Sequence, residues 1–204
     1  WLITYFRNLL YDKNIIKSYK IDIPVISVGN LTTGGTGKTP HVIMITELLM
    51  YNYNIAIVSR GYKRKTKNNI VVKSDSDYRE VGDEPLMIKR RFGDRVVVVV
   101  ARKRIEGIRL IEKLYPNVNL IMLDDGFQHR RIKPDVNILL TRFDKLFYND
   151  IILPLGSLRE SSKNVSRSDI IIVTNTSNSF VDYNEIENNI KRKVKKQRIF
   201  FSEV

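Results

Sequence analysis

The sequence has 204 residues, and its 35 lysines and arginines outnumber 22 acidic residues, giving a formal net charge of +13. This excess favours anionic partners, such as phosphorylated substrates, nucleic acid or an anionic membrane surface. The chain contains no cysteine and two histidines, which excludes disulfides and thiolate metal sites and argues against a histidine-based metal centre. The longest apolar run, residues 96–101, is far shorter than the roughly 18 residues of a membrane-spanning helix.

Residues 1–20 form an apolar N-terminal segment with basic flanks. The stretch from Trp1 to Tyr11 combines aromatic and aliphatic side chains with Arg7, and three lysines follow it. This pattern is typical of an amphipathic helix that associates with a membrane interface. It is equally typical of a helix packed on a domain core. We therefore expect a helix and leave its surroundings open.

A glycine-rich loop, residues 29–40, separates the apolar run Ile23–Val28 from a segment with helical periodicity, residues 41–50. A strand that leads through such a loop into a helix N-terminus is the geometry that holds polyphosphate. Lys38 would add a positive charge, and the hydroxyl of Thr39 would reach a magnesium ion. The loop departs from the full signature at Thr32, where the pattern has glycine. The alternative is a flexible loop without a ligand.

Apolar strands alternate with helical segments after this loop. Residues 55–59, 70–73, 96–101, 120–123 and 136–140 predict strands, and residues 84–91 and 102–115 predict helices. Continuous apolar strands interleaved with helices indicate a mostly parallel sheet covered by helices. The sequence therefore predicts an α/β fold that is P-loop NTPase-like, with the P-loop domain over residues 21–145.

The pattern loosens from about Phe143 onward. A strand over residues 169–173, a charged helix over 181–195 and a last strand over 198–202 follow. We expect these elements to begin a second, incomplete α/β domain at residues 146–204. Because the chain starts at Trp1 and stops directly after an apolar run, we also expect it to be a fragment of a longer protein.

The predicted strand 120–123 runs directly into Asp124 and Asp125. An acidic residue at a strand's carboxyl end is where P-loop enzymes place a magnesium-organising carboxylate, so Asp124 is expected near Thr39. The Asp-Gly pair is also a turn signal. His129 lies four residues beyond Asp125 and is followed by arginines. It is a candidate contact to a polar or phosphorylated substrate, with a structural histidine as the alternative.

Three further segments are candidates. Asp83 and Glu84, between Gly82 and Pro85, are either an acidic helix N-cap or carboxylates that orient and deprotonate an attacking hydroxyl. The basic loop that begins at Ser59-Arg60-Gly61-Tyr62 would hold a substrate phosphate or remain a solvated charge run. Residues 153–160 predict a turn into a helix, with Arg159 as a candidate charge clamp.

Taken together, these segments resemble the tetraacyldisaccharide 4'-kinase family of lipid A biosynthesis. The resemblance covers residues 1 to about 175 and is most specific in the run Asp124–Arg131. It implies transfer of the ATP γ-phosphoryl group, with Mg²⁺, to the 4'-hydroxyl of a tetraacyl glucosamine disaccharide 1-phosphate. It further implies a monomeric enzyme, peripheral on the cytoplasmic face of the bacterial inner membrane, whose partner is an anionic glycolipid and not nucleic acid.

The resemblance also assigns roles to residues of this chain. The ATP phosphates would be held by Thr32, Thr33, Gly34, Gly35, Thr36, Gly37, Lys38 and Thr39. Magnesium would be held by Thr39, Asp124 and Glu84. Asp83 would be the base that acts on the sugar hydroxyl, with Lys38 and Asp125 as further catalytic residues. The substrate contacts would be Asn30, Arg60, Tyr62, Gln128, His129 and Arg159.

The sequence also departs from the family. Residues 147–150 lack the usual glycines, residues 101–104 are more basic, and family members are longer, with a C-terminal histidine that assists the catalytic aspartate. A nucleotide-binding remnant without turnover is therefore an alternative. Another is a partitioning or targeting ATPase that binds DNA or membrane, although that group has lysine where Thr33 stands. Residues 174–177 lack the guanine-reading motif of a GTPase.

Overall fold

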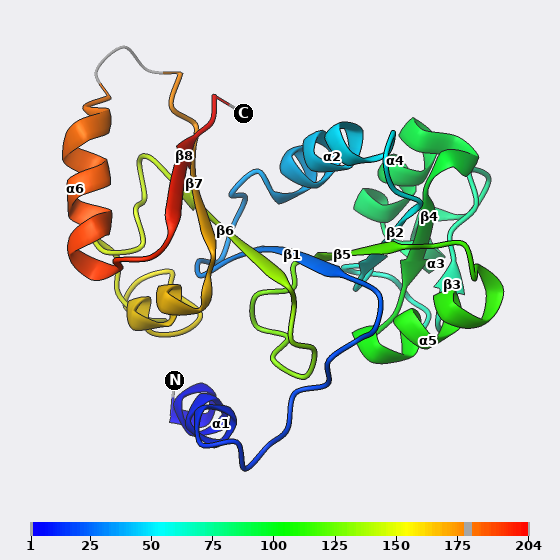
Figure 1. Cartoon of the computed structure of the whole chain (residues 1–204), viewed down its shortest axis with the longest axis horizontal. Helices are drawn as coiled ribbons and strands as arrows, with labels where there is room; N and C mark the ends of the chain where they lie inside the picture. The colour runs from blue at the N-terminus through cyan, green and yellow to red at the C-terminus, as the bar shows by residue number, and fades with distance from the viewer. Residues whose placement is uncertain (1, 178–180, 204) are drawn as a thin grey trace.

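The structure is a computed structural model that describes residues 2–177 and 181–203; Trp1, part of the predicted N-terminal segment, lies outside them. Eight strands form one sheet in the order β3-β4-β2-β5-β1-β6-β7-β8 (Figure 1). All neighbouring strands are parallel except β3 and β4. The strands are β1 (Val25–Asn30), β2 (Ile55–Ser59), β3 (Ile70–Val71), β4 (Val97–Val100), β5 (Leu120–Asp124), β6 (Val136–Arg142), β7 (Ile170–Thr174) and β8 (Arg198–Phe201). The predicted α/β fold with a mostly parallel sheet is confirmed.

The longer helices lie where the apolar periodicity predicts them. The helices are α1 (Leu2–Asp12), α2 (Lys38–Leu49), α3 (Tyr78–Val81), α4 (Asp83–Phe92), α5 (Arg104–Leu114) and α6 (Tyr183–Lys193), with 3₁₀ turns η1 (Gly93–Arg95) and η2 (Ser162–Arg167). The single turn α3 was not predicted, because four residues are too few to show a helical period. It begins where the Asp77 carboxylate accepts a 2.8 Å hydrogen bond from the Arg79 N–H.

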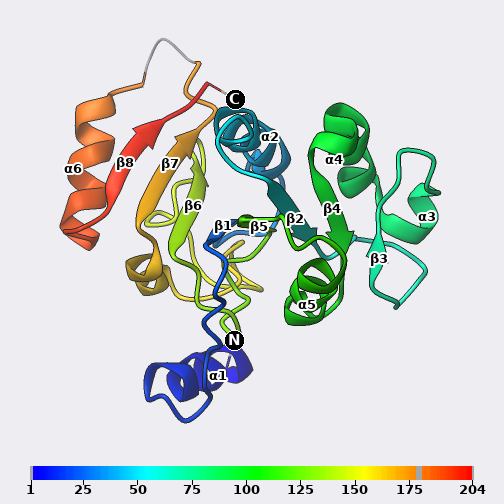
Figure 2. The same ribbon diagram turned by 45° about the vertical axis from the view of Figure 1, so that its right-hand side comes forward.

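Helices cover both faces of the sheet (Figure 2). On one face, α2 and α4 pack against the strands through Val42 and Ile88. On the other face, α5 packs through Ile108, and α6 packs through Ile190. Every residue of β2 and β5 is buried, as expected for central parallel strands with two covered faces.

The strands of the C-terminal part continue the same sheet. Leu139 of β6 pairs with Ile171 of β7, and β7 pairs in turn with β8. The sheet therefore runs without interruption across the predicted boundary at residues 145–146. The division into a P-loop domain and a second domain stays a prediction.

The segment predicted as a turn into a helix, residues 153–160, contains a turn, and the 3₁₀ helix η2 follows it. The Leu158 N–H donates to Ile151 at 3.0 Å, and the Arg159 N–H donates to Leu31 at 2.7 Å. These hydrogen bonds fix the turn and join it to Leu31, directly after β1. The next helical segment, η2, begins only at Ser162.

Helix α1 combines a bonded inner side with an exposed apolar side. The carbonyl of Asn8 accepts a 2.9 Å hydrogen bond from Arg130, which also forms a 2.6 Å ion pair with Asp12. Leu2 and Ile3 are 58% and 86% exposed. Within residues 2–177 and 181–203, helices are too short or too polar to cross a membrane.

Candidate active site

The carboxyl ends of three neighbouring strands bring predicted site residues to one edge of the sheet. β1 ends at Asn30, β2 ends at Ser59, and β5 ends at Asp124. Val28 and Asp124 are register partners, so the Asp124 side chain points to the face that α2 covers. Ligands of parallel α/β sheets bind at this edge, because loops and helix N-termini meet there.

Asn30, at the end of β1, forms hydrogen bonds to residues of the glycine-rich loop. Its amide Nδ2 donates to Thr36 Oγ1 at 2.9 Å, and its Oδ1 accepts a long, 3.5 Å hydrogen bond from Lys38 Nζ. On the outer side of the loop, the Thr33 N–H donates to the Ser157 carbonyl at 2.8 Å. The loop is therefore held from the strand end and from the segment before η2.

The glycines leave the loop open above the helix N-terminus. Gly34 and Gly37 have φ values of 108° and 74°, a region that favours glycine. Among the described residues, nothing lies within 4 Å of where a Cβ of Gly34 or Gly35 would stand. Thr32, the departure from the loop signature, is 5% exposed and forms a β-bridge with Leu158. Its backbone belongs to a paired segment, which explains why glycine is not needed there.

Asp124 is a buried carboxylate with one oxygen unsatisfied. It is 2% exposed, and its Oδ2 accepts a 2.8 Å hydrogen bond from the Ser59 hydroxyl. Its Oδ1 has no hydrogen-bond partner among the described residues. Burial raises the pKa of the Asp124 carboxyl. In the described part of the chain, no group of three His, Asp or Glu side chains forms a metal site alone.

Asp125 points elsewhere, as expected for adjacent acidic residues with different surroundings. Its backbone has a φ of 51°, because it is the first residue beyond β5 and turns the chain. Its carboxylate lies 3.8 Å from Lys38 Nζ and 3.2 Å from Arg159 Nη1. The structure thus brings three predicted site residues, Lys38, Asp125 and Arg159, into one group.

Asp83 and Glu84 are exposed in the first turn of α4. Gly82, which precedes them, has a φ of 91° and packs on Gly61, whose Cα would lie 3.1 Å from an added Cβ. Although the residue as a whole is exposed, its carboxyl group is partly buried, and this burial raises the pKa of Glu84, as does the charge of Asp124, while a hydrogen bond from the Thr39 hydroxyl opposes the shift. Glu84 therefore reaches the same edge as the end of β5.

Arg60 and Tyr62 lie on the loop after β2. Both are exposed, and Tyr62 is 74% exposed beside Lys63, whose Nζ lies 5.5 Å from the ring centroid. The contact between Gly61 and Gly82 places this basic loop next to the start of α4. Its exposure leaves both side chains available to a ligand.

Gln128 takes part in a buried hydrogen-bond network. Its Nε2 donates to the Asn30 carbonyl at 2.7 Å and to Glu160 Oε1 at 3.1 Å. Glu160 is 1% exposed and forms a 2.7 Å ion pair with Arg167. Sequence reasoning gave Glu160 no structural role; two of its partners, Asn8 and Gln128, lie 152 and 32 residues away.

His129 lies apart from the glycine-rich loop. It is half-buried and lines a separate cavity with Phe127 and Arg130. Burial and the positive charges of Arg104 and Arg60 lower the pKa of His129 to about 4. The ring is therefore neutral near pH 7.

Arg104 is a buried site residue that sequence reasoning missed. It is 1% exposed, and its Nη2 donates to the Asp124 carbonyl at 2.9 Å while its Nη1 donates to the Ala101 carbonyl at 3.1 Å. Burial lowers the pKa of Arg104 to about 10. One signal was available in the sequence. A positive charge at the first position of a helix interacts unfavourably with the helix dipole, so Arg104 at the start of α5 indicates a role other than helix stabilisation.

The fold and this edge of the sheet define a P-loop NTPase-like protein: a glycine-rich turn joins β1 to α2, and an acidic residue ends the neighbouring strand β5. The family model described as LpxK, tetraacyldisaccharide-1-P 4'-kinase, matches residues 1–202. The chain belongs to this family, which confirms the resemblance found in its motifs.

Curated relatives carry the same family name. The chain is 50% identical over 171 residues to the tetraacyldisaccharide 4'-kinase of Porphyromonas gingivalis, a match that covers 82% of this chain and 47% of that protein. It is 42% identical over 203 residues to that of Parabacteroides distasonis, covering 98% and 54%. The chain therefore spans about half the length of the curated relatives it matches.

One solved structure agrees with this assignment, and a second shares the fold. LpxK from Aquifex aeolicus, described as an "apo" form in complex with ATP, superposes with a TM-score of 0.80 at 30% identity, covering 98% of this chain and 77% of that chain. Apo McdA from Cyanothece has a TM-score of 0.51 at 11% identity, covering 90% and 85%. That second likeness shows the fold alone and gives no support to a partitioning function.

Proposed function

We propose that this chain forms the ATP-binding part of a kinase that phosphorylates the 4'-hydroxyl of a tetraacyl glucosamine disaccharide 1-phosphate in lipid A biosynthesis. Family membership supports this reaction. The observation that carries it is the meeting of Lys38, Asp124 and Asp125 at one edge of the sheet. Because the chain spans about half of its relatives, we propose the activity for the longer family protein.

The glycine-rich loop would hold the ATP phosphates. Gly34 and Gly35 are open, the N–H groups at the start of α2 lack intrahelical acceptors, and Lys38 adds a charge. The Oδ1 of Asp124, which has no hydrogen-bond partner among the described residues, fits Mg²⁺, because this ion prefers oxygen ligands. Glu84 and the hydroxyl of Thr39 would be the other protein ligands. ATP supplies the phosphoryl group, and Mg²⁺ offsets charge on its oxygens.

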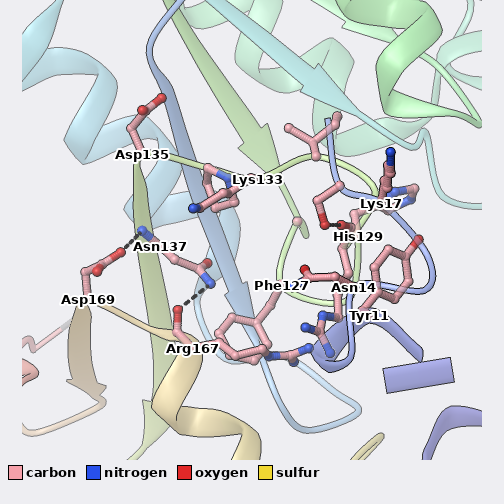
Figure 3. Close-up of a pocket in the computed structure, with 15 residues that line it drawn as sticks. Tyr11, Asn14, Lys17, Phe127, His129, Lys133, Asp135, Asn137, Arg167 and Asp169 are labelled. Atoms are coloured by element: carbon pink, nitrogen blue, oxygen red, sulfur yellow. Dashed lines mark hydrogen bonds between the residues drawn. The ribbon is translucent and has the colours of Figure 1, made fainter. Parts of the chain in front are cut away.

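Asp83 would accept the proton of the sugar hydroxyl. It is exposed at the start of α4, beside Glu84, so a hydroxyl can approach it. Lys38 and Asp125 would position the transferred group through their mutual contact at 3.8 Å. The proposed substrate contacts are Asn30, Arg60, Tyr62, Gln128 and Arg159 on the surrounding loops and strand end, together with His129, which lies farther away in the wall of a separate cavity (Figure 3).

Helix α1 would bring the enzyme to its substrate. Leu2, Ile3 and Phe6 expose an apolar surface, and the chain carries a net charge of +13. These features favour an interface that contains anionic lipid. We therefore propose a monomeric, peripheral protein on the cytoplasmic face of the inner membrane, with an anionic glycolipid as its partner.

Transfer of ³²P from labelled ATP to the disaccharide 1-phosphate tests this function. The chain extended to full family length should transfer label, and Asp83→Asn should abolish transfer while ATP binding persists. Asp94→Asn is the matched control, because Asp94 is an exposed residue beyond the far end of α4. Absence of transfer by the full-length protein would contradict the proposal. ATP binding without transfer by the 204-residue chain alone would instead select a nucleotide-binding function without turnover for this chain.

A further inference from the structure

His41 is a buried histidine in the first turn of α2, four residues after the last glycine of the glycine-rich loop. It is 0% exposed, and its Nδ1 lies 2.7 Å from the carbonyl oxygen of Gly37. A carbonyl oxygen can only accept a hydrogen bond, so Nδ1 carries a hydrogen and donates it. His41 is not among the proposed ligands of ATP or magnesium.

The second ring nitrogen of His41, Nε2, has no hydrogen-bond partner in the described ranges 2–177 and 181–203. A buried polar atom without a partner is unfavourable. An aromatic hydrocarbon ring would occupy this place without that cost. Packing alone therefore gives no reason for a histidine here, and the bond from Nδ1 to Gly37 is what distinguishes it from an apolar ring.

Gly37 joins the loop to α2 without a side chain to fix its conformation. Its φ is 74°, and no side chain caps the helix at this position. Glycine has more backbone freedom than other residues. The Gly37 carbonyl accepts from the His41 N–H at 3.1 Å as well as from Nδ1. Two donors of one residue therefore hold this carbonyl.

The Gly37 carbonyl determines where the Lys38 N–H points. Both groups belong to one planar trans peptide, in which they point in opposite directions. The Lys38 N–H is the first of α2, so it has no acceptor within the helix. Such an N–H faces the space beyond the helix N-terminus, where an anion binds. Fixing the carbonyl therefore fixes a donor of the loop.

We propose that His41 is a positioning residue for the nucleotide. Its Nδ1–H holds the Gly37 carbonyl and thereby directs the Lys38 N–H at the ATP phosphates. A donor that is already fixed loses little conformational entropy when the ligand binds, and a hydrogen bond at the carbonyl polarises the N–H of the same peptide. This inference rests on the proposed function of the loop as the ATP site, and it adds a residue that does not touch the ligand.

Calorimetric titration of the chain with ATP and Mg²⁺ separates the hydrogen bond from the shape of the ring. His41→Phe keeps an aromatic ring without a donor and should weaken ATP binding about three- to tenfold. His41→Asn is smaller but carries an N–H group close to the place of Nδ1, and should bind within about twofold of the wild type. The reverse order, with ATP binding kept in His41→Phe and weakened in His41→Asn, would overturn the proposal.

Thr46→Val is the matched control. Thr46 is also fully buried in α2, and its hydroxyl donates to the Val42 carbonyl at 2.6 Å. This bond, like that of His41, joins a side chain to the carbonyl four residues earlier, but Val42 lies outside the loop. Thr46→Val should therefore leave ATP affinity unchanged. An equal loss in Thr46→Val and His41→Phe would overturn the proposal, because any buried bond of α2 would then have this effect.

Lys38→Ala distinguishes this inference from the proposed nucleotide site. ATP binding that is weakened in Lys38→Ala but unchanged in His41→Phe overturns the role of His41 alone. ATP binding that is unchanged in both variants overturns the nucleotide site, and the role of His41 with it.

A second measurement uses the wild-type chain and needs no ATP. ¹⁵N NMR of the two imidazoles, with His41→Asn for assignment, should show the hydrogen of the neutral His41 ring on Nδ1. A neutral ring with its hydrogen on Nε2 could not donate to Gly37 and would overturn the proposal. This result does not depend on whether the variants fold.

Discussion

The side-chain amide of Asn8, in α1, donates a 2.7 Å hydrogen bond to Glu160, which lies 152 residues further along the chain. The same carboxylate pairs with Arg167 and accepts from Gln128, whose Nε2 also reaches the Asn30 carbonyl. One buried carboxylate thus connects the N-terminal helix to the strand end that begins the glycine-rich loop.

Replacing Glu160 should therefore destabilise the fold. Glu160→Gln keeps the shape but removes the charge, which leaves Arg167 buried without its ion pair. We expect a loss of about 3 kcal/mol in the free energy of unfolding, measured by urea denaturation. Glu187→Gln is the control, because its pair with Lys191 is exposed and should contribute less than about 1 kcal/mol. Similar losses for both variants would show that the Glu160 network is not a structural centre.

Asp124→Asn should separate stability from ligand binding. Burial raises the pKa of Asp124, so its contribution to stability is present below the ordinary carboxyl pKa of about 3.9 and is lost as pH rises through the raised value. At pH 7 the variant should unfold at the same or a higher temperature, and its free energy of unfolding should rise by up to about 1–2 kcal/mol. Its Mg²⁺-dependent ATP binding should fall. A clear drop in the unfolding temperature would contradict this account of Asp124.

His129 should titrate far below the ordinary range. Its pKa is about 4, so the stability it contributes is present above pH 6.5 and is lost as pH falls toward 4. Full loss would be about 1–3 kcal/mol, because partial exposure screens the effect. With two histidines in the chain, NMR titration with His129→Gln for assignment resolves the signal. A measured His129 pKa between 6 and 7 would refute the buried, neutral ring.

The exposed face of α1 should govern membrane binding. Ile3→Ser/Phe6→Ser removes apolar area that is 86% and 58% exposed, respectively, and should weaken partition into anionic vesicles about 10- to 100-fold in a sedimentation assay. Leu48→Ser/Tyr51→Ser is the matched control, because both residues are exposed at the end of α2. Equal partition of the two double variants would exclude α1 as the membrane-binding element.

Local motifs predicted the framework of the site. The loop at residues 29–40 and the strand that ends at Asp124 contain their own signals, since glycines, a lysine and an apolar run lie within one short stretch. Both segments have the predicted local structure: Lys38 lies at the start of α2, and Asp124 lies at the end of β5. The roles of the individual side chains stay predictions.

The buried hydrogen bonds that support the site could not be predicted, because they join residues that no sequence motif or spacing relates to one another. Gln128 and Asn30 are 98 residues apart, and Arg104 reaches the Asp124 carbonyl from another helix. The loosened pattern after Phe143 also gave no sign that β7 would pair with β6. Its long, irregular connection hides the continuity of the sheet.

The most direct measurement of the central claim is calorimetric titration of the chain with ATP, with and without Mg²⁺. The account predicts Mg²⁺-dependent binding that Lys38→Ala weakens about 10- to 100-fold, because a charge-assisted contact to phosphate is lost. Lys113→Ala, an exposed residue of α5, should bind like the wild type. ATP binding that is unchanged in Lys38→Ala, or that shows no dependence on Mg²⁺, would contradict the account.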